Sequence, residues 1–304
     1  MKTSIGIIGT GWVGSSVAIS TLHAGVAQEV LLYDRREEVA EGDAMDLAHG
    51  APFYSPASVR TASVEAMREC AAVVVTAGRG GKPGETRLDL LRDNAATVRD
   101  IGARLAGFPG IIVMVTNPVD VLTHVMTEAS GLPPARVIGT GTMLDTARLR
   151  QVLGEELNID PRSVHAQVIG EHGDSEVVLW SQAAVGGKML RDWPGWTPEH
   201  EANVAGRVRT AAYEIIRRKG ATNHAIGLVT AALLRYMLRG DRRVLTVSRV
   251  QEGACGLTDV ALSLPSIVGA DGATSILEPA MSDEERARLH ASAEVLRKAL
   301  GSLR

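Results

Sequence analysis

A glycine-rich turn near the N-terminus constrains the fold of this chain more than any other feature. In the segment GIIGTGWVGSSVA, Gly9, Gly11 and Gly14 form a G-x-G-x-x-G pattern. The pattern follows the apolar run 4–9, which is typical of a buried strand, and opens a helix-period segment over 12–25. Such glycines allow a tight turn, close approach of a pyrophosphate and tight packing of helix on strand. Alone they are compatible with a structural turn, but the strand–turn–helix context favours a dinucleotide site.

Asp34 supports the same interpretation. It ends the second apolar run, EVLLYD, 20 residues after Gly14, close to the position where an acid binds the ribose hydroxyls of a dinucleotide. A carboxylate there repels a 2′-phosphate, so the sequence predicts NAD, with NADP left as a minor alternative by Arg35 and Arg36. Further contacts to the cofactor are expected from Trp12, Val13, Thr76, Ala77, Gly78 and Asn117.

Apolar runs alternate with helix-period segments through the first half of the chain. Strands are expected over 4–9, 29–34, 71–78, 110–117 and 136–141, and long helices over 86–106 and 119–130. Continuous apolar strands separated by helices predict a parallel sheet covered on both faces. Residues 1–140 are therefore interpreted as an α/β domain of the Rossmann type, a doubly wound parallel sheet that binds the dinucleotide.

The pattern changes after residue 140. Helices are expected over 142–157, 199–218, 222–239 and 282–301, with hairpin-like strands including 242–250 and 259–269. This mixture predicts an α+β catalytic domain over residues 141–304. No repeat or low-complexity linker separates the halves, so we expect them to pack tightly.

Composition excludes several classes of function. The formal net charge of −3 and the aromatic content of 3% disfavour a nucleic-acid partner. No run reaches the ~18 apolar residues of a membrane span, and the N-terminus has no leader pattern, so no membrane partner is expected. The two cysteines, Cys70 and Cys255, form neither a metal spacing nor a disulfide framework. These features predict a cytoplasmic protein without a bound metal.

Five polar residues could form a catalytic centre beside the dinucleotide. Arg87 ends the glycine-rich segment AGRGGKPGETR, and Asn117 follows a strand in TNPVD. Asp145 and Arg148 lie three apart on one face of a helix, and GEHGDS supplies His172. Each has an ordinary interpretation, such as a loop charge, a turn residue or a solvated i,i+3 pair. A non-catalytic NAD-binding protein would not need all five, so together they indicate an enzyme.

These segments occur in the order of the L-lactate/malate dehydrogenase family, which the chain resembles over essentially its whole length. The segments GEHGDSE, TNPVDVLT and KGATNHAIGL are more similar to the lactate branch. The resemblance implies an NAD-dependent oxidoreductase acting on CH–OH, which interconverts a small 2-oxo acid, pyruvate, and L-lactate in glycolysis and fermentation. Malate dehydrogenase, or an L-2-hydroxy acid dehydrogenase of broader specificity, is the alternative.

The resemblance also implies a role for each residue. His172 would exchange a proton with the substrate oxygen, because an ordinary pKa of ~6.5 allows both of its forms near neutrality. Asp145 would fix the imidazole tautomer, and Arg148 would bind the substrate carboxylate bidentately. Arg87, on a mobile loop, would polarise the substrate carbonyl. Asn117 would hydrogen-bond the substrate oxygen, and its bond to the following proline is expected to be cis.

One position departs from the family pattern. Six residues before the loop arginine, lactate enzymes carry glutamine and malate enzymes arginine, whereas this chain has Gly81. Glycine either leaves a roomier pocket for longer or branched 2-oxo acids, or allows Arg79 or Lys82 to pair with the second carboxylate of oxaloacetate. Thr222, at the far wall of the pocket, leaves space and supplies no cation.

Assembly and regulation also follow from the resemblance. Relatives are dimers or tetramers, and those of the lactate branch are usually tetramers, so a homotetramer or a dimer is expected. Bacterial lactate enzymes often bind fructose 1,6-bisphosphate between subunits through an arginine and a histidine. The matching positions are Arg150 and His165. An allosteric site is one interpretation of this pair, and two plain interface residues are the other.

Overall fold

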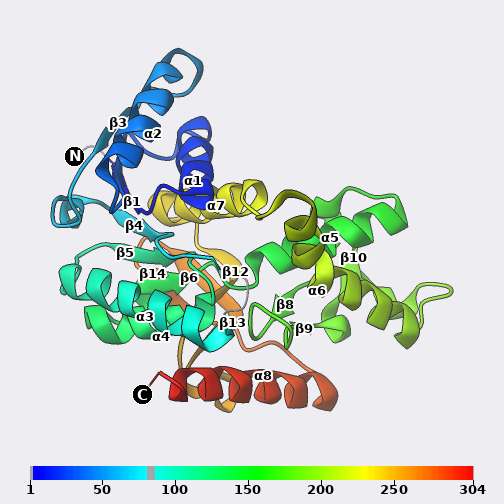
Figure 1. Cartoon of the computed structure of the whole chain (residues 1–304). Helices are drawn as coiled ribbons and strands as arrows, with labels where there is room; N and C mark the ends of the chain where they lie inside the picture. The colour runs from blue at the N-terminus through cyan, green and yellow to red at the C-terminus, as the bar shows by residue number, and fades with distance from the viewer. Residues whose placement is uncertain (1–2, 81–85, 304) are drawn as a thin grey trace.

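A single nine-stranded sheet runs through the described part of the molecule (Figure 1). The computed structural model describes residues 3–80 and 86–303, so Gly81 and Lys82 lie outside it. The strand order is β14-β13-β12-β6-β5-β4-β1-β2-β3. The six parallel strands are β1 (Ser4–Ile8), β2 (Glu29–Tyr33), β3 (Ser58–Thr61), β4 (Ala72–Val75), β5 (Ile111–Met114) and β6 (Val137–Gly139). The order reverses between β1 and β4, and ligands of such sheets bind at this switch point.

Helices cover both faces of the parallel strands. They are α1 (Trp12–His23), α2 (Glu37–His49), α3 (Arg87–Arg104) and α4 (Val119–Ser130). The doubly wound fold predicted from the sequence is therefore confirmed, with two elements that the sequence did not predict. Strand β3 alternates exposed and half-buried residues instead of forming an apolar run, and α2 buries only Ala40 and Ala44. Neither element has the apolar periodicity that identifies a strand or a helix.

The second half combines helices with antiparallel strands, as predicted. Its long elements are α5 (Met143–Leu157), α6 (Pro198–Lys219), α7 (His224–Arg239), α8 (Asp283–Gly301), β12 (Arg243–Glu252), β13 (Thr258–Gly269) and β14 (Gly272–Ile276). Its two-residue strands are β7 (Val164–His165), β8 (Val168–Ile169), β9 (Val177–Val178), β10 (Ala184–Val185) and β11 (Lys188–Met189). Strand β12 pairs with β6 at Ser248 and Gly139, so the hairpin strands extend the sheet of the first half.

The apolar core forms layers on the two sides of the sheet. Ile5 and Ile7 pack with α1 and α7, whereas Ile8 packs in the layer of α3, α4 and α8. Figure 1 shows α1 and α7 on one side and α3, α4 and α8 on the other. Because both faces of β4 and β5 are buried, these strands consist of uninterrupted apolar residues. Within the described residues, no helix has both the length and the apolar character needed to cross a bilayer.

Candidate active site

The glycine turn leaves little room for side chains. Gly9 has a φ of +100°, in the region that favours glycine. A Cβ on Gly14 would lie 1.9 Å from the carbonyl oxygen of Gly9, so α1 approaches β1 as closely as backbone atoms permit. Gly11 caps the N-terminus of α1 without a side chain. A turn of this shape exposes the first N–H groups of the helix, which fits a pyrophosphate.

A cleft of about 650 Å³ lies beside this turn at the ends of β1, β2 and β4. Its lining includes Gly9, Gly11, Asp34, Thr76, Ala77 and Gly78, which are six of the residues expected to bind the cofactor. The carboxylate of Asp34 accepts hydrogen bonds from the backbone N–H groups of Thr10 at 3.0 Å and Arg36 at 3.1 Å. These bonds fix the carboxylate at the edge of the cleft. An acid in this position fits ribose hydroxyls and opposes a 2′-phosphate, so the residues present fit NAD.

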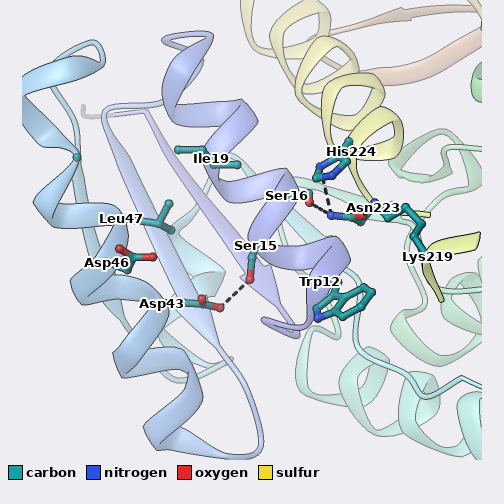
Figure 2. Close-up of a pocket in the computed structure, with 11 residues that line it drawn as sticks. Trp12, Ser15, Ser16, Ile19, Asp43, Asp46, Leu47, Lys219, Asn223 and His224 are labelled. Atoms are coloured by element: carbon teal, nitrogen blue, oxygen red, sulfur yellow. Dashed lines mark hydrogen bonds between the residues drawn. The ribbon is translucent and has the colours of Figure 1, made fainter. Parts of the chain in front are cut away.

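A second cavity of about 650 Å³ lies between α1, α2 and the start of α7 (Figure 2). Trp12, which is expected to contact the cofactor and is 62% exposed, lines this cavity. Val13 packs against the apolar layer of α1 and α7. Ser15 donates a hydrogen bond to Asp43 across the cavity at 2.8 Å. The lining does not include the expected catalytic residues among those described.

His172, Asp145 and Arg148 are in direct contact. The Nδ1 atom of His172, in the loop between β8 and β9, lies 2.5 Å from Oδ2 of Asp145 in the first turn of α5. The Nη1 atom of Arg148, one turn further along the helix, donates to Oδ1 of Asp145 at 2.8 Å. One buried carboxylate therefore holds two cationic groups. Because Nδ1 of the imidazole faces this carboxylate, Nε2 is the nitrogen that can meet a substrate.

The contacts shift the pKa values of both partners. Burial disfavours the imidazolium of His172, but the charge and hydrogen bond of Asp145 outweigh it and raise the pKa to about 9. Burial likewise acts to raise the pKa of Asp145, and the opposing charges of His172 and Arg148 lower it overall. The imidazole is therefore protonated at neutral pH, as a proton donor must be.

Two buried polar residues that the sequence did not single out position this centre. Asp120, in the first turn of α4, accepts the backbone N–H of His172 at 2.7 Å, and burial raises its pKa to about 6. Asn94, on α3, accepts the backbone N–H of Arg79 at 2.9 Å and donates to the carbonyl oxygen of Asn117 at 3.0 Å. The available signal was a polar residue in the interior of the helix predicted over 86–106 and an acid in the first turn of the helix predicted over 119–130.

The turn that carries His172 is held by side chains on either side of it. Glu171 accepts hydrogen bonds from the backbone N–H and the hydroxyl of Ser175. Its own N–H donates to the hydroxyl of Ser292 at 2.8 Å, which joins the turn to α8. Asp174 accepts the hydroxyl of Tyr213, on α6, at 2.8 Å. The backbone of Glu171 and the carboxylate of Asp174 thus connect the loop to α8 and α6.

The structure describes some, but not all, of the other residues that are expected to bind the substrate. Asn117 is exposed at the end of β5, and its bond to Pro118 is cis, as predicted. Thr222 is half-buried in the link between α6 and α7. Arg87 is the first residue of α3; its side chain lies outside the described part, as does Gly81. Arg79 is paired with Asp93 at 2.7 Å.

The expected effector residues lie on neighbouring segments of the second half, α5 and β7. Arg150, on α5, donates from Nε to the carbonyl oxygen of Ala166 at 3.1 Å. His165, which directly precedes Ala166, is exposed on β7. Burial first, and then the charge of Arg243, lower the pKa of Arg150. Among the described residues, no cluster of three or more His, Cys, Asp and Glu could hold a metal ion.

Comparison with known proteins agrees with this geometry. Residues 3–139 match the lactate/malate dehydrogenase NAD-binding domain, and residues 142–303 match the alpha/beta C-terminal domain of that family. The chain is 44% identical to an L-lactate dehydrogenase of Synechococcus sp. (strain JA-3-3Ab), over 100% of both chains. It is also 44% identical to that of Thermus aquaticus, over 98% of this chain and 99% of the relative.

Solved structures give the same result. A minor L-lactate dehydrogenase from Enterococcus mundtii, crystallised in a ligands-bound form, superposes with a TM-score of 0.96. Its sequence is 40% identical, and the match covers 99% of this chain and 98% of that one. On these matches, and on a fold shared over its whole length, the chain belongs to the lactate/malate dehydrogenase family.

Proposed function

We propose that this protein is an NAD-dependent L-lactate dehydrogenase, which reversibly reduces pyruvate to L-lactate. The observation that carries the proposal is the contact of both His172 and Arg148 with the buried carboxylate of Asp145. The full-length L-lactate dehydrogenase relatives support it. In this proposal residues 1–140 bind the dinucleotide and residues 141–304 supply most of the catalytic groups.

The chemistry divides between the coenzyme and the side chains. NADH, when bound, supplies the hydride that reduces the ketone carbon. His172 holds a proton at Nε2 and donates it to the ketone oxygen, while Nδ1–H remains directed at Asp145. Asp145 stabilises the imidazolium before the transfer and keeps the neutral imidazole in the tautomer that can take the proton back. The high pKa of His172, about 9, keeps it loaded for reduction at neutral pH.

Arg148, Arg87 and Asn117 bind the substrate in this proposal. Arg148 uses the edge of its guanidinium that does not face Asp145 to bind the carboxylate of the 2-oxo acid. Asn117, exposed at the end of β5, donates to the substrate oxygen. Arg87, at the start of α3, stabilises the negative charge that develops on that oxygen.

The substrate preference is tested with NADH and a panel of 2-oxo acids. Pyruvate is expected to exceed oxaloacetate in kcat/KM, because Arg79, one candidate partner for a second carboxylate, is held by Asp93. Glycine at position 81, which has no side chain, also favours activity with 2-oxobutyrate and 2-oxoisocaproate. A chain that prefers oxaloacetate would be a malate dehydrogenase. Gly81→Arg should gain oxaloacetate activity and the neighbouring Gly80→Arg should gain less; equal gains would refute the assigned loop position.

We further propose that the chain forms a homotetramer or a dimer. Large apolar side chains are exposed on the helices around the second cavity, namely Ile19 on α1, Met45 on α2 and Leu228 on α7. Burial of such a surface stabilises association. Analytical ultracentrifugation of Leu228→Glu should give a smaller species than the wild type. Val295→Glu, on the exposed face of α8, is the control, and an unchanged mass for both variants would exclude this surface.

A regulatory anion site is proposed at Arg150 and His165. Arg150 is half-buried near Arg243, and two such cations favour a phosphorylated ligand such as fructose 1,6-bisphosphate. The bisphosphate should lower the KM for pyruvate of the wild type and have little effect on Arg150→Gln. Arg162→Gln, an exposed arginine paired with Asp160, is the control. No change in the wild type would remove the proposal.

The proposed physiological setting is the cytoplasm. There the reduction of pyruvate regenerates NAD for glycolysis during fermentation.

A further inference from the structure

Glu176 is a buried acid that the proposed mechanism does not use. It follows the GEHGDS turn directly and precedes β9. Its side chain is only 6% exposed, and its Oε1 atom is buried without a hydrogen-bond partner among the described residues. Buried carboxylates are ordinarily paired or hydrogen-bonded, because an isolated buried charge is costly. Glu176 therefore requires a separate explanation.

The charged groups around Glu176 belong to the proposed catalytic centre and to α6. Asp145 and Arg148 face it from α5, His172 from the preceding turn, and Arg209 from α6. Arg209 is half-buried, and its Nε atom also lacks a partner among the described residues. No ion pair within 4 Å joins Glu176 to Arg209 in the part of the chain that the structure describes. The charge of Arg209 thus acts on Glu176 without an ion pair between them, and both side chains have a buried polar atom without a described partner.

The protonation state of Glu176 follows from this environment. Burial, followed by the negative charge of Asp145, raises its pKa to about 8, although Arg209, His172 and Arg148 act in the opposite direction. The carboxyl group is consequently neutral for the most part at pH 7 and ionised at pH 9.5. Ionisation adds a further negative charge to the region that contains Asp145 and Asp120.

We propose that Glu176 is a positioning residue that, with Arg209, sets the negative charge facing the substrate carboxylate at Arg148. The inference rests on the proposed function, since it requires a substrate with a carboxylate. While Glu176 keeps its proton, Arg148 attracts the substrate with Asp145 and Asp120 as the opposing anions. Once Glu176 loses its proton, the added charge repels the substrate, and Arg209 offsets that repulsion only in part.

The first test compares Glu176→Gln, which imitates the protonated acid, with the wild type. L-Lactate and NAD are used because lactate binds to the neutral imidazole, so loss of the proton from His172 does not itself weaken binding. At pH 7 the KM for L-lactate should agree within about twofold. At pH 9.5 the variant should have a KM lower by roughly three- to tenfold, the effect of one like charge at intermediate dielectric. Glu214→Gln, an exposed carboxylate on α6, is the matched control and should follow the wild type.

The second test needs no turnover. Histidine ¹³Cε1 NMR, with the His172 signal assigned from a His172→Asn variant, should give a lower pKa for His172 in Glu176→Gln and no change in Glu214→Gln. Arg209→Gln removes the cation that favours ionised Glu176, so the alkaline change in KM should move to higher pH. That variant also provides the test if Glu176→Gln does not fold.

The outcomes separate the inference from the proposed function. Equal KM values at pH 9.5 and an unchanged pKa of His172 would overturn the role of Glu176. A wild-type enzyme inert toward L-lactate and all other 2-hydroxy acids would overturn the proposed function, and the NMR titration would then decide whether Glu176 is coupled to His172.

Discussion

The substitution Asp145→Asn removes the charge that keeps His172 protonated while changing the shape of the side chain very little. Burial disfavours the imidazolium, and the carboxylate of Asp145, 2.5 Å from Nδ1, is the main group that outweighs it. Without that charge the burial effect prevails, apart from a smaller contribution from Asp120. The pKa of His172 should therefore fall from about 9 to its ordinary 6.5 or below.

The size of the effect follows from this change. A fall from about 9 to 6.5 corresponds to roughly 3 kcal/mol of lost stabilisation of the imidazolium, at about 1.4 kcal/mol per pKa unit. At pH 7.5 the protonated fraction drops from nearly all molecules to about a tenth or less. The loss of imidazolium alone should lower kcat/KM for pyruvate about tenfold. The amide NH₂ can also donate to Nδ1 and select the wrong tautomer, so the total loss should reach about 10²- to 10⁴-fold.

The assay is the dependence of kcat/KM for pyruvate on pH between 5.5 and 10. The wild type should lose activity with an alkaline midpoint near 9, and Asp145→Asn with a midpoint at or below 6.5. Glu155→Gln, an exposed carboxylate on the same helix, is the control and should keep the midpoint of the wild type. An Asp145→Asn enzyme whose midpoint stays near 9 would refute the assignment of Asp145 as the group that holds the proton on His172.

Three further substitutions test the substrate and coenzyme sites. Arg148→Lys keeps the charge but loses the planar fork, so the KM for pyruvate should rise at least about tenfold; an unchanged KM would mean that the carboxylate binds elsewhere. Asp34→Ser removes the acid at the ribose position, so the preference for NADH over NADPH in kcat/KM should fall at least about tenfold, and a preserved preference would contradict that contact. Gly14→Ala places a Cβ 1.9 Å from the carbonyl oxygen of Gly9, so NADH binding measured by fluorescence should be lost and the Tm should fall. Gly42→Ala, whose Cβ meets no described atom within 4 Å, is the control, and an equal fall in Tm would contradict the close approach at Gly14.

The strands that the sequence predicted are those whose two faces are both buried. In β4 consecutive residues contact opposite apolar layers, so Ala72–Val75 forms an unbroken apolar run that is recognisable without a structure. Strand β3 lies at the edge of the sheet and includes Arg60, so its sequence resembles that of a loop. Burial on both sides, rather than strand formation as such, is the property that a sequence reveals.

The candidate site was predictable to the extent that it is local or shared with a family. The spacing of Asp145 and Arg148 on one helix face follows from helical geometry. The contact of His172 with Asp145 depends on how the loop after β8 packs against α5, and no periodicity encodes that packing; the family resemblance supplied it. Asp120 and Glu176 were missed because their roles depend on neighbours distant in sequence. The partner of Asp120, for example, is the backbone N–H of a residue 52 positions away.

The charges around the proposed substrate position give a physical reason to expect a monocarboxylic substrate. At pH 7 the cations are His172, Arg148 and Arg209, and the anions are Asp145 and Asp120. With Glu176 protonated, these three described cations face two anions, and one substrate carboxylate neutralises the difference, while Arg87 in the proposed mechanism faces the charge that develops on the substrate oxygen. The second carboxylate of oxaloacetate would leave an unpaired negative charge, as would ionised Glu176, unless the loop that includes Gly81 supplied another cation. If that balance governs specificity, Glu176→Gln should discriminate against oxaloacetate less strongly than the wild type does at pH 9.5. At pH 7 the two enzymes should discriminate against it to the same degree.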